Sequence, residues 1–177
     1  MNKTDFTYGI NAEKERDLSL TMGYFKHLQS KRLPVRVVAA DGQAFSMRVT
    51  GFDLRSSRIY FSPFTDDAKA NRVIIPAEYI ISAEVIDASE VDTIHKGQLT
   101  LRRGDFEDNG YIRSGRDFFQ VIRYAYQQGK PIRVYLSDNR VLEGVSTGMN
   151  EQSVGLRLSN NKTIQLYYDW VDRIVPL

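Results

Sequence analysis

The side chains that most often carry catalysis are scarce in this sequence. Its only two histidines, His27 and His95, lie far apart, whereas a protein metal site needs two or more ligands close together. The chain has no cysteine, which excludes a thiolate nucleophile, a thiolate metal site and a disulfide within it. Gly104 and Gly110 lie in a polar stretch without the strand-to-helix setting of a phosphate-binding glycine loop. We therefore expect a binding protein with no enzymatic activity, metal or cofactor.

The overall charge leaves the kind of ligand open. The 177 residues carry 24 Lys and Arg against 22 Asp and Glu, so the formal net charge is +2. This weakly basic balance permits nucleic-acid binding without indicating it. No stretch reaches the roughly 20 apolar residues that span a membrane, and the N-terminal residues lack the apolar core of a secretion signal. We expect a cytoplasmic protein without a membrane partner.

The elements that must position any binding residues are repeated. Residues 34–51 align with residues 131–148 without a gap, at an offset of 97. The matching pairs are Pro34 and Pro131, Arg36 and Arg133, Asp41 and Asp138, and Gly51 and Gly148. Such internal repetition predicts one small structural unit used twice.

Each repeat begins with a helical pattern and continues with strands. The helical spacing is carried by Leu18, Met22, Phe25 and Leu28 in the first repeat, and by Phe118, Ile122 and Ala125 in the second. Alternating or apolar runs predict strands at 35–37, 44–50, 58–62 and twice within 72–86, and again at 132–134, 141–147, 154–159 and twice within 163–175. Hairpin turns are expected at residues 41–42 and 138–139, and a bend or bulge is expected at Gly51 and at Gly148, the glycines that align between the repeats. We expect a mostly β fold with domains at 12–87 and 116–177, joined by a charged linker at 88–115 whose residues 98–101 could add a strand.

The second repeat, residues 118–176, resembles the Hfq branch of the Sm-like family. The resemblance rests on Lys-Pro-Ile-Arg-Val-Tyr-Leu at 130–136, a two-residue turn, Val-Leu-Glu-Gly at 141–144 and Val-Asp-Arg-Ile-Val-Pro at 171–176. The first repeat keeps Pro34-Val35, Asp41-Gly42 and Gly51-Phe52-Asp53. This resemblance implies two tandem Sm-like barrels, each a small, bent, antiparallel, five-stranded barrel preceded by an α-helix.

The same resemblance implies a set of RNA-binding residues. The tyrosine at the end of the first strand, Tyr135, corresponds to the family's base-stacking aromatic residue, although it could equally be a half-exposed strand tyrosine. Tyr167 and Tyr168 stand where the family has a uridine-binding run, but Asp169 replaces its histidine. Basic residues on the helices correspond to the family's lateral rim. The full set is Tyr135, Leu142, Tyr167, Tyr168, Lys26, Lys31, Arg32 and Arg123.

The function implied is the binding of single-stranded RNA, with A-rich sequences favoured, in post-transcriptional regulation. Two barrels per chain imply a homo-oligomer in which three chains close a six-barrel ring through their edge strands. One alternative is a protein-assembly module that has kept the scaffold and lost RNA binding. A weaker alternative is a nucleotide-binding barrel, because residues 53–59 slightly resemble the PilZ family.

Overall fold

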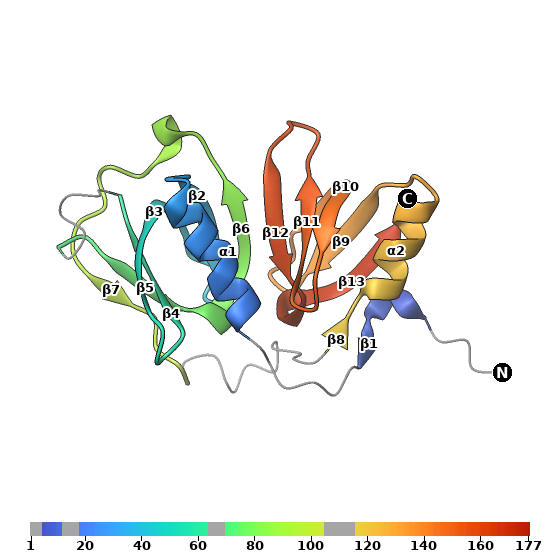
Figure 1. Ribbon diagram of the computed structural model, residues 1–177, viewed down its shortest axis with the longest axis horizontal. Coiled ribbons are helices and arrows are strands. Elements are labelled where there is room, and N and C mark those ends of the chain that lie inside the picture. The colour runs from blue at the N-terminus through green and yellow to red at the C-terminus, as the bar shows by residue number, and fades with distance from the viewer. Residues whose placement is uncertain (1–4, 12–17, 64–69, 105–115) are drawn as a thin grey trace. The chain divides into compact units, whose positions relative to one another are not determined.

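The computed structural model describes residues 5–11, 18–63, 70–104 and 116–177. The chain divides into two compact units (Figure 1). Residues 17–109 form the first, which we call the central unit. Residues 1–16 and 110–177 together form the second, the terminal unit, so the terminal unit is interrupted in sequence by the central one.

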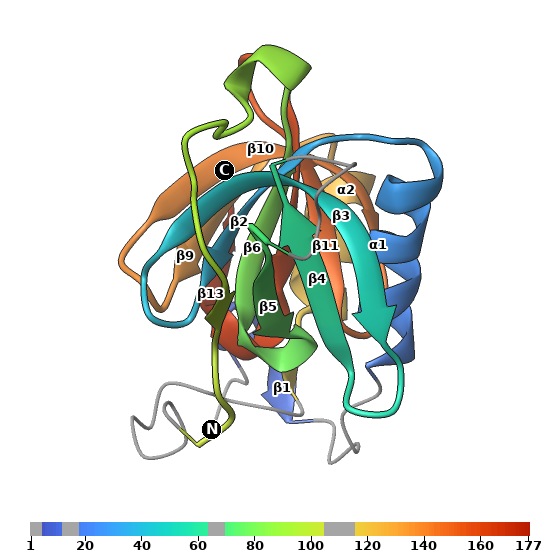
Figure 2. The ribbon, with the colours of Figure 1, turned by 90° about the vertical axis from the view of Figure 1, so that its left-hand side faces the viewer.

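The central unit is a helix on an antiparallel sheet (Figure 2). Its elements are α1 (Ser19–Ser30), β2 (Val35–Ala39), β3 (Ala44–Asp53), β4 (Arg58–Ser62), β5 (Val73–Pro76), β6 (Ile80–Val85) and β7 (Leu99–Thr100), with single 3-10 turns at Ala77–Tyr79 and Ala88–Glu90. The strand order is β6-β2-β3-β4-β5-β7, and only β7 runs parallel to its neighbour. The apolar stripe of α1 is buried, and Phe25 meets Phe61 of β4 edge-on at 5.7 Å between ring centres. The helical spacing in the sequence therefore marks the face of α1 that closes the core.

The terminal unit repeats this plan. Its elements are the 3-10 turn Phe6–Tyr8, β1 (Ile10–Asn11), β8 (Arg116–Asp117), α2 (Phe119–Gln127), β9 (Ile132–Leu136), β10 (Val141–Met149), β11 (Ser153–Arg157), β12 (Thr163–Tyr167), the 3-10 turn Tyr168–Trp170 and β13 (Val171–Pro176). Within this unit the strands β13-β9-β10-β11-β12 follow the same order as β6-β2-β3-β4-β5. The short strands β1 and β8 pair with each other.

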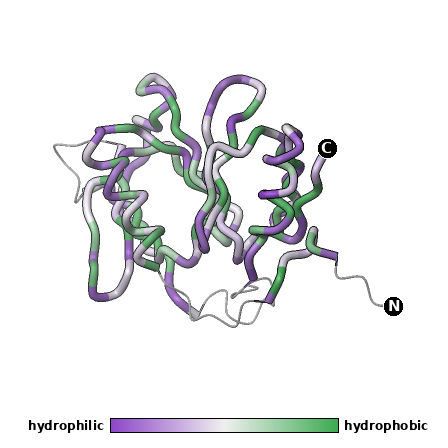
Figure 3. Tube along the Cα trace, turned by 45° about the vertical axis from the view of Figure 1, so that its right-hand side comes forward, coloured by the Kyte–Doolittle hydropathy of each residue, from purple (hydrophilic) through white to green (hydrophobic). Residues whose placement is uncertain are grey.

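The turn and bulge residues of the two repeats behave as the sequence predicts. Gly42 and Asn139 both have positive φ, 86° and 70°, in the hairpin turns that follow β2 and β9. The pairing register slips just before Gly51 in the central unit and just before Gly148 in the terminal unit. Each slip is a β-bulge, which bends the long strand and increases its twist. Along the chain trace, hydrophobic and hydrophilic residues alternate over short distances in both units, as half-buried strands require (Figure 3).

The mostly β fold with helices is confirmed, but closed barrels are not observed. In the described residues no ladder joins β6 to β5 or β7, and none joins β13 to β12, so each sheet is open. Residues 98–101 of the expected linker were predicted as a possible added strand, and they contain β7, which pairs with β5 of the central unit. Leu99 and Leu101 donate backbone hydrogen bonds to Arg72 and Ile74, and Leu101 is 5% exposed. No described helix is both long and apolar enough to cross a bilayer.

Candidate phosphate-binding face

The outward side of the central sheet gathers arginines around a tyrosine. Side chains alternate along β4, so that Ile59 and Phe61 are fully buried while Arg58 and Tyr60 lie half-buried on the other side. Arg48 of β3 stands opposite Ser62, two residues beyond Tyr60 on the same side of the sheet. We call this set the basic face: Arg48, Arg58, Tyr60 and Arg72, the last directly preceding β5.

The tyrosine ring organises this face. The guanidinium carbon of Arg72 lies 4.4 Å from the centre of the Tyr60 ring, a cation–π contact. On the neighbouring strand Gly51 is paired with Tyr60, and a Cβ added at Gly51 would come within 3.2 Å of the ring. The missing side chain of Gly51 thus leaves room for the ring, and the ring in turn holds the Arg72 guanidinium. A stacked guanidinium keeps its N–H edges available for an anion.

Within the described ranges the arginines of the basic face form no ion pair, although hydrogen bonds within its own turn and then the charge of Arg58 lower the pKa of Asp53. The Nε atoms of Arg58 and Arg72 are buried and donate no hydrogen bond to the part of the chain that the structure describes. Because neither Nε atom is accessible, an anion at this face would have to contact the terminal Nη groups of these arginines. Arg48 differs, because its Nη1 donates to the backbone carbonyl of Arg32 at 3.0 Å.

The nearest carboxylate is engaged in its own turn. Asp53, paired with Arg58 across β3 and β4, accepts hydrogen bonds from the backbone amides of Arg55 and Ser56 at 3.1 and 3.3 Å. Asn150 plays the same part in the terminal unit, accepting from the amides of Gln152 and Ser153. These two residues order the loops after the long strands. Hydrogen bonds from Ser56 lower the pKa of the Asp53 carboxyl most, and Arg58 lies close enough for its charge to help lower it.

The terminal unit does not repeat the basic face. Tyr60 is paired with Gly51 on one neighbouring strand and with Ile74 on the other. In the terminal unit Gly155 has the equivalent pairing, with Gly148 on one side and Gln165 on the other. Gly155 therefore takes the position of Tyr60. The positions of Arg58 and Arg72 are taken by Ser153 and Thr163. A Cβ added at Gly155 would meet the side chain of Gln165 at 2.9 Å, so the glutamine occupies the space above the glycine.

Two tyrosines predicted to bind RNA belong to the core instead. Tyr167 is 6% exposed and Tyr168 is 2% exposed. The Tyr168 ring lies 5.4 Å from the ring of Phe118, and burial raises the pKa of the Tyr168 hydroxyl. Side chains alternate between the two sides of β12 only as far as Tyr167, because Tyr168 begins a 3-10 turn. The alternation therefore does not expose either tyrosine side chain. Their assignment as accessible RNA contacts is therefore wrong.

Tyr135 and Leu142 point to opposite sides of their sheet. Tyr135 stands opposite Val141, whereas Leu142 stands opposite Val134, which is fully buried. The Tyr135 hydroxyl and then the Glu143 carboxylate raise the pKa of Arg133, so the tyrosine is tied to its own sheet. These two residues cannot line one surface.

The predicted basic residues are divided between the two units. Lys26, Lys31 and Arg32 are exposed on α1 or just after it, and Arg123 is exposed on α2 with its guanidinium 5.8 Å from the Phe119 ring. Only Arg32 meets the basic face, through its carbonyl bond to Arg48. The repeated arginines also stay within their own units, where Arg36 donates to Ser46 and Arg133 pairs with Glu143 at 2.6 Å.

Sequence reasoning missed Arg58, Tyr60 and Arg72. The alternation of Arg58, Ile59, Tyr60 and Phe61 was a usable signal for the first two. Arg72 and Tyr60 lie on either side of the connection between β4 and β5. Neither hydrophobic periodicity nor composition predicts the register in which these two strands pair. The basic face therefore becomes evident only from the pairing of β4 with β5.

Comparison with known proteins relates both units to one family. The family model described as repressor of phase-1 flagellin matches residues 5–174. A protein of Salmonella abony named repressor of phase 1 flagellin gene is 30% identical over 179 residues, covering 98% of this chain and 94% of the relative. Proteins of the same name from Salmonella typhimurium and Salmonella abortus-equi are also 30% identical, covering 98% and 96% of this chain and 94% and 92% of those relatives.

These matches correct the resemblance to the Hfq branch of the Sm-like family. The family that spans residues 5–174, and hence both repeats, is a repressor family. Hfq-like binding of A-rich RNA is therefore withdrawn, and the matches support neither the protein-assembly module nor the PilZ-like barrel. The resemblance rested partly on turn residues and bulge glycines, which short, strongly bent sheets of different families share, so these positions do not identify one family.

Proposed function

The chain belongs to the family of repressors of phase-1 flagellin, and we propose that it represses expression of a flagellin gene as a regulator without enzymatic activity. The match supports this reading because it spans both units rather than one shared module. Three relatives that carry the repressor name align along 92% or more of their own length. A repressor of gene expression acts where the gene is read, so the proposal places the protein in the cytoplasm.

The repressor would hold the phosphate backbone of the nucleic acid that carries the flagellin sequence. The observation that supports this step is the grouping of Arg48, Arg58 and Arg72 on one side of the sheet, with no ion pair among the described residues. Arginine suits phosphate because its planar donors match two oxygens at once. Arg72 covers one side of the Tyr60 ring, and Gly51 of β3 lies against another. The ring would therefore hold the Arg72 guanidinium in place, and it would not stack on a nucleic-acid base.

A binding assay with three variants tests the role of the basic face. Fluorescence anisotropy would compare duplex DNA upstream of a flagellin gene, the leader of its transcript, and a scrambled control of each. Arg58→Gln and Arg72→Gln should each weaken binding, and each lost phosphate contact should reduce the slope of log Kd on log salt by about 0.9 on duplex DNA or about 0.7 on a single strand. Arg157→Gln is the matched control, because Arg157 is exposed on β11, the strand equivalent to β4.

A reporter assay tests repression itself. A flagellin gene fused to a reporter should be repressed by the intact chain, less by the Arg58→Gln and Arg72→Gln variants, and fully by Arg157→Gln. Unchanged affinity and salt slope in both variants would remove the basic face from the proposal while leaving repression standing. Full reporter expression in the presence of the folded, intact chain would refute the repressor function.

Oligomerisation stays a prediction. The ring of three chains was implied by the Sm-like resemblance, and the single chain contains no contact that tests it. A solution mass near the 20.3 kDa of one chain would rule out the ring.

A further inference from the structure

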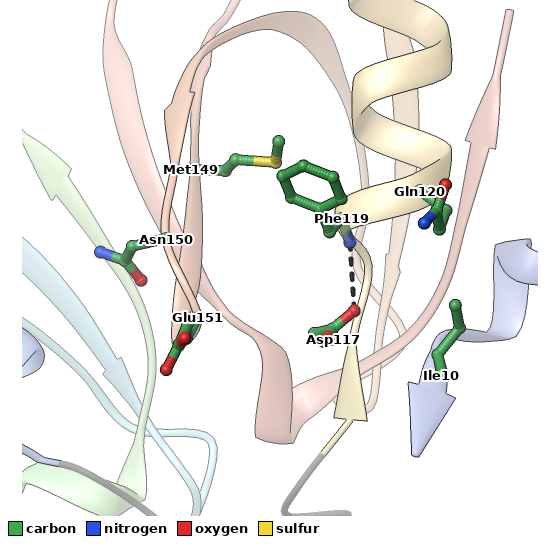
Figure 4. A pocket seen from close by; sticks show the side chains of 7 residues that line it. All are labelled: Ile10, Asp117, Phe119, Gln120, Met149, Asn150 and Glu151. Carbon is green, nitrogen blue, oxygen red and sulfur yellow. Dashed lines mark hydrogen bonds between the residues drawn. The ribbon is translucent and has the colours of Figure 1, made fainter. Parts of the chain in front are cut away.

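A cavity of about 460 Å³ opens in the terminal unit at the start of α2 (Figure 4). Four elements line it: Ile10 comes from β1, Asp117 from β8, Phe119 and Gln120 from α2, and Met149, Asn150 and Glu151 from the end of β10 and the turn after it. Its volume falls within the range of small-molecule sites, roughly 300–1,000 Å³. No residue of the basic face lines it.

The cavity has an apolar wall. The thioether of Met149 and the ring of Phe119 point toward one another across the space between β10 and α2, and Ile10 closes the side formed by the N-terminal segment (Figure 4). Phe119 is 45% exposed, with the guanidinium of Arg123 5.8 Å from its ring centre. The apolar wall would therefore gain free energy from contact with an apolar ligand.

The charged groups of the cavity are carboxylates. Asp117 uses one oxygen to accept a hydrogen bond from the backbone amide of Phe119 at 3.4 Å, and its other oxygen accepts none from the described residues. Glu151, which also has an interaction partner of its own, lines another part of the same cavity, and no Lys or Arg of the described residues lines it. Two arginines lie near the cavity without lining it. Arg123 sits over the Phe119 ring at 5.8 Å, and Arg116, which directly precedes Asp117, donates to two backbone carbonyls. The carboxylates of the lining favour a cation and repel an anion.

We propose that this cavity binds a small organic cation, an ammonium group carried on an apolar body. The ammonium would donate hydrogen bonds to Asp117 and lie within reach of Glu151, while the apolar body packs on Phe119, Met149 and Ile10. The amides of Gln120 and Asn150 would fix the orientation of any further polar group. The proposal does not depend on nucleic-acid binding or on repression.

Methionine methyl NMR tests the site directly. Phenethylamine, protonated at neutral pH, is the probe, and it should shift the methyl signal of Met149 in a saturable way. Met22 and Met47, which are 5% and 0% exposed in the central unit, are internal references whose signals should not move. Uncharged 2-phenylethanol, anionic 3-phenylpropionate and methylammonium separate the contribution of the charge from that of the apolar body, and each should bind more weakly than phenethylamine.

Charge-removing variants test which groups hold the ammonium. Asp117→Asn keeps an oxygen for the amide of Phe119, and it should weaken phenethylamine binding about threefold to fivefold, the upper range for a partly exposed charge pair. The double variant Asp117→Asn/Glu151→Gln should weaken binding further, to about tenfold. Asp172→Asn is the matched control, since Asp172 lies on β13 and does not line the cavity. No shift of Met149, an equal shift with 3-phenylpropionate, or an unchanged Kd in the double variant would each overturn the proposal.

Discussion

Replacement of Arg116 by alanine should selectively destabilise the terminal unit. Arg116 joins three separate segments, because its Nη1 donates to the carbonyl of Tyr8 at 2.7 Å and its Nη2 donates to the carbonyl of Val171 on β13. Its guanidinium carbon also lies 5.4 Å from the centre of the Phe118 ring. The side chain thus holds the N-terminal segment against the sheet that the rest of the unit forms.

The size of the effect follows from these contacts. A hydrogen bond from a charged donor is worth about 1.5–3 kcal/mol when it is protected from water, and the bond to Val171 is partly buried. The bond to Tyr8 is exposed and should contribute about 0.5–1 kcal/mol. The contact with Phe118 adds about 0.5–1 kcal/mol. Arg116→Ala should therefore lower the free energy of unfolding of the terminal unit by about 3 kcal/mol.

The chain contains its own reporter for this measurement. Trp170 is the only tryptophan, and it lies 3% exposed in the terminal unit, so its fluorescence follows the unfolding of that unit. Urea titrations should show a lower midpoint with an unchanged m value, since the surface exposed on unfolding stays nearly the same. Arg123→Ala is the control, because Arg123 is exposed and its only contact given by the structure is with Phe119. A loss below about 1 kcal/mol for Arg116→Ala, or an equal loss for both variants, would refute the reasoning.

Three further predictions concern stability. Gly23→Ala should stabilise the central unit by about 0.5–1 kcal/mol in thermal unfolding, because a Cβ there meets nothing within 4 Å inside a helix. Gly144→Ala should instead destabilise the terminal unit by about 2 kcal/mol or more, since its Cβ would lie 2.4 Å from the backbone oxygen of Arg157; an increase in Tm would contradict this. Hydrogen bonds from the side chain and then the amide of Thr7 lower the pKa of Asp5 below 3.8, so folding is stabilised above that pH and this stability is lost as the pH falls through the lowered pKa. Trp170 fluorescence should show that Asp5→Asn weakens this acid dependence; an identical acid profile would count against it.

The order of the elements could be predicted from the sequence because it depends on local signals. The spacing of apolar residues marked α1 and α2, and the turn residues Gly42 and Asn139 marked the hairpins. The repeat glycines Gly51 and Gly148 marked the bulges. In each case the information lies within a few residues of the element that it specifies.

The candidate sites could not be predicted because they depend on contacts between distant segments. The basic face needs the register of β4 against β5, which places Arg72 on Tyr60. The cavity needs β1 beside β8, a pairing between Ile10 and Asp117 that no local pattern reveals. The resemblance to the Sm-like family predicted an accessible Tyr168, but the residue lies in a 3-10 turn after β12 and is buried. A match in strand order does not specify the direction of a side chain in such a turn.

The division of the terminal unit between the two ends of the chain has a consequence for synthesis. The segment 5–11 is made before the central unit, whereas its hydrogen-bond partners Arg116 and Arg173 are made after it. The central unit, complete by residue 109, can fold while the first segment still waits. Translation therefore separates the two folding events in time, because Arg116 and Arg173 must be made before segment 5–11 can pack in the terminal unit.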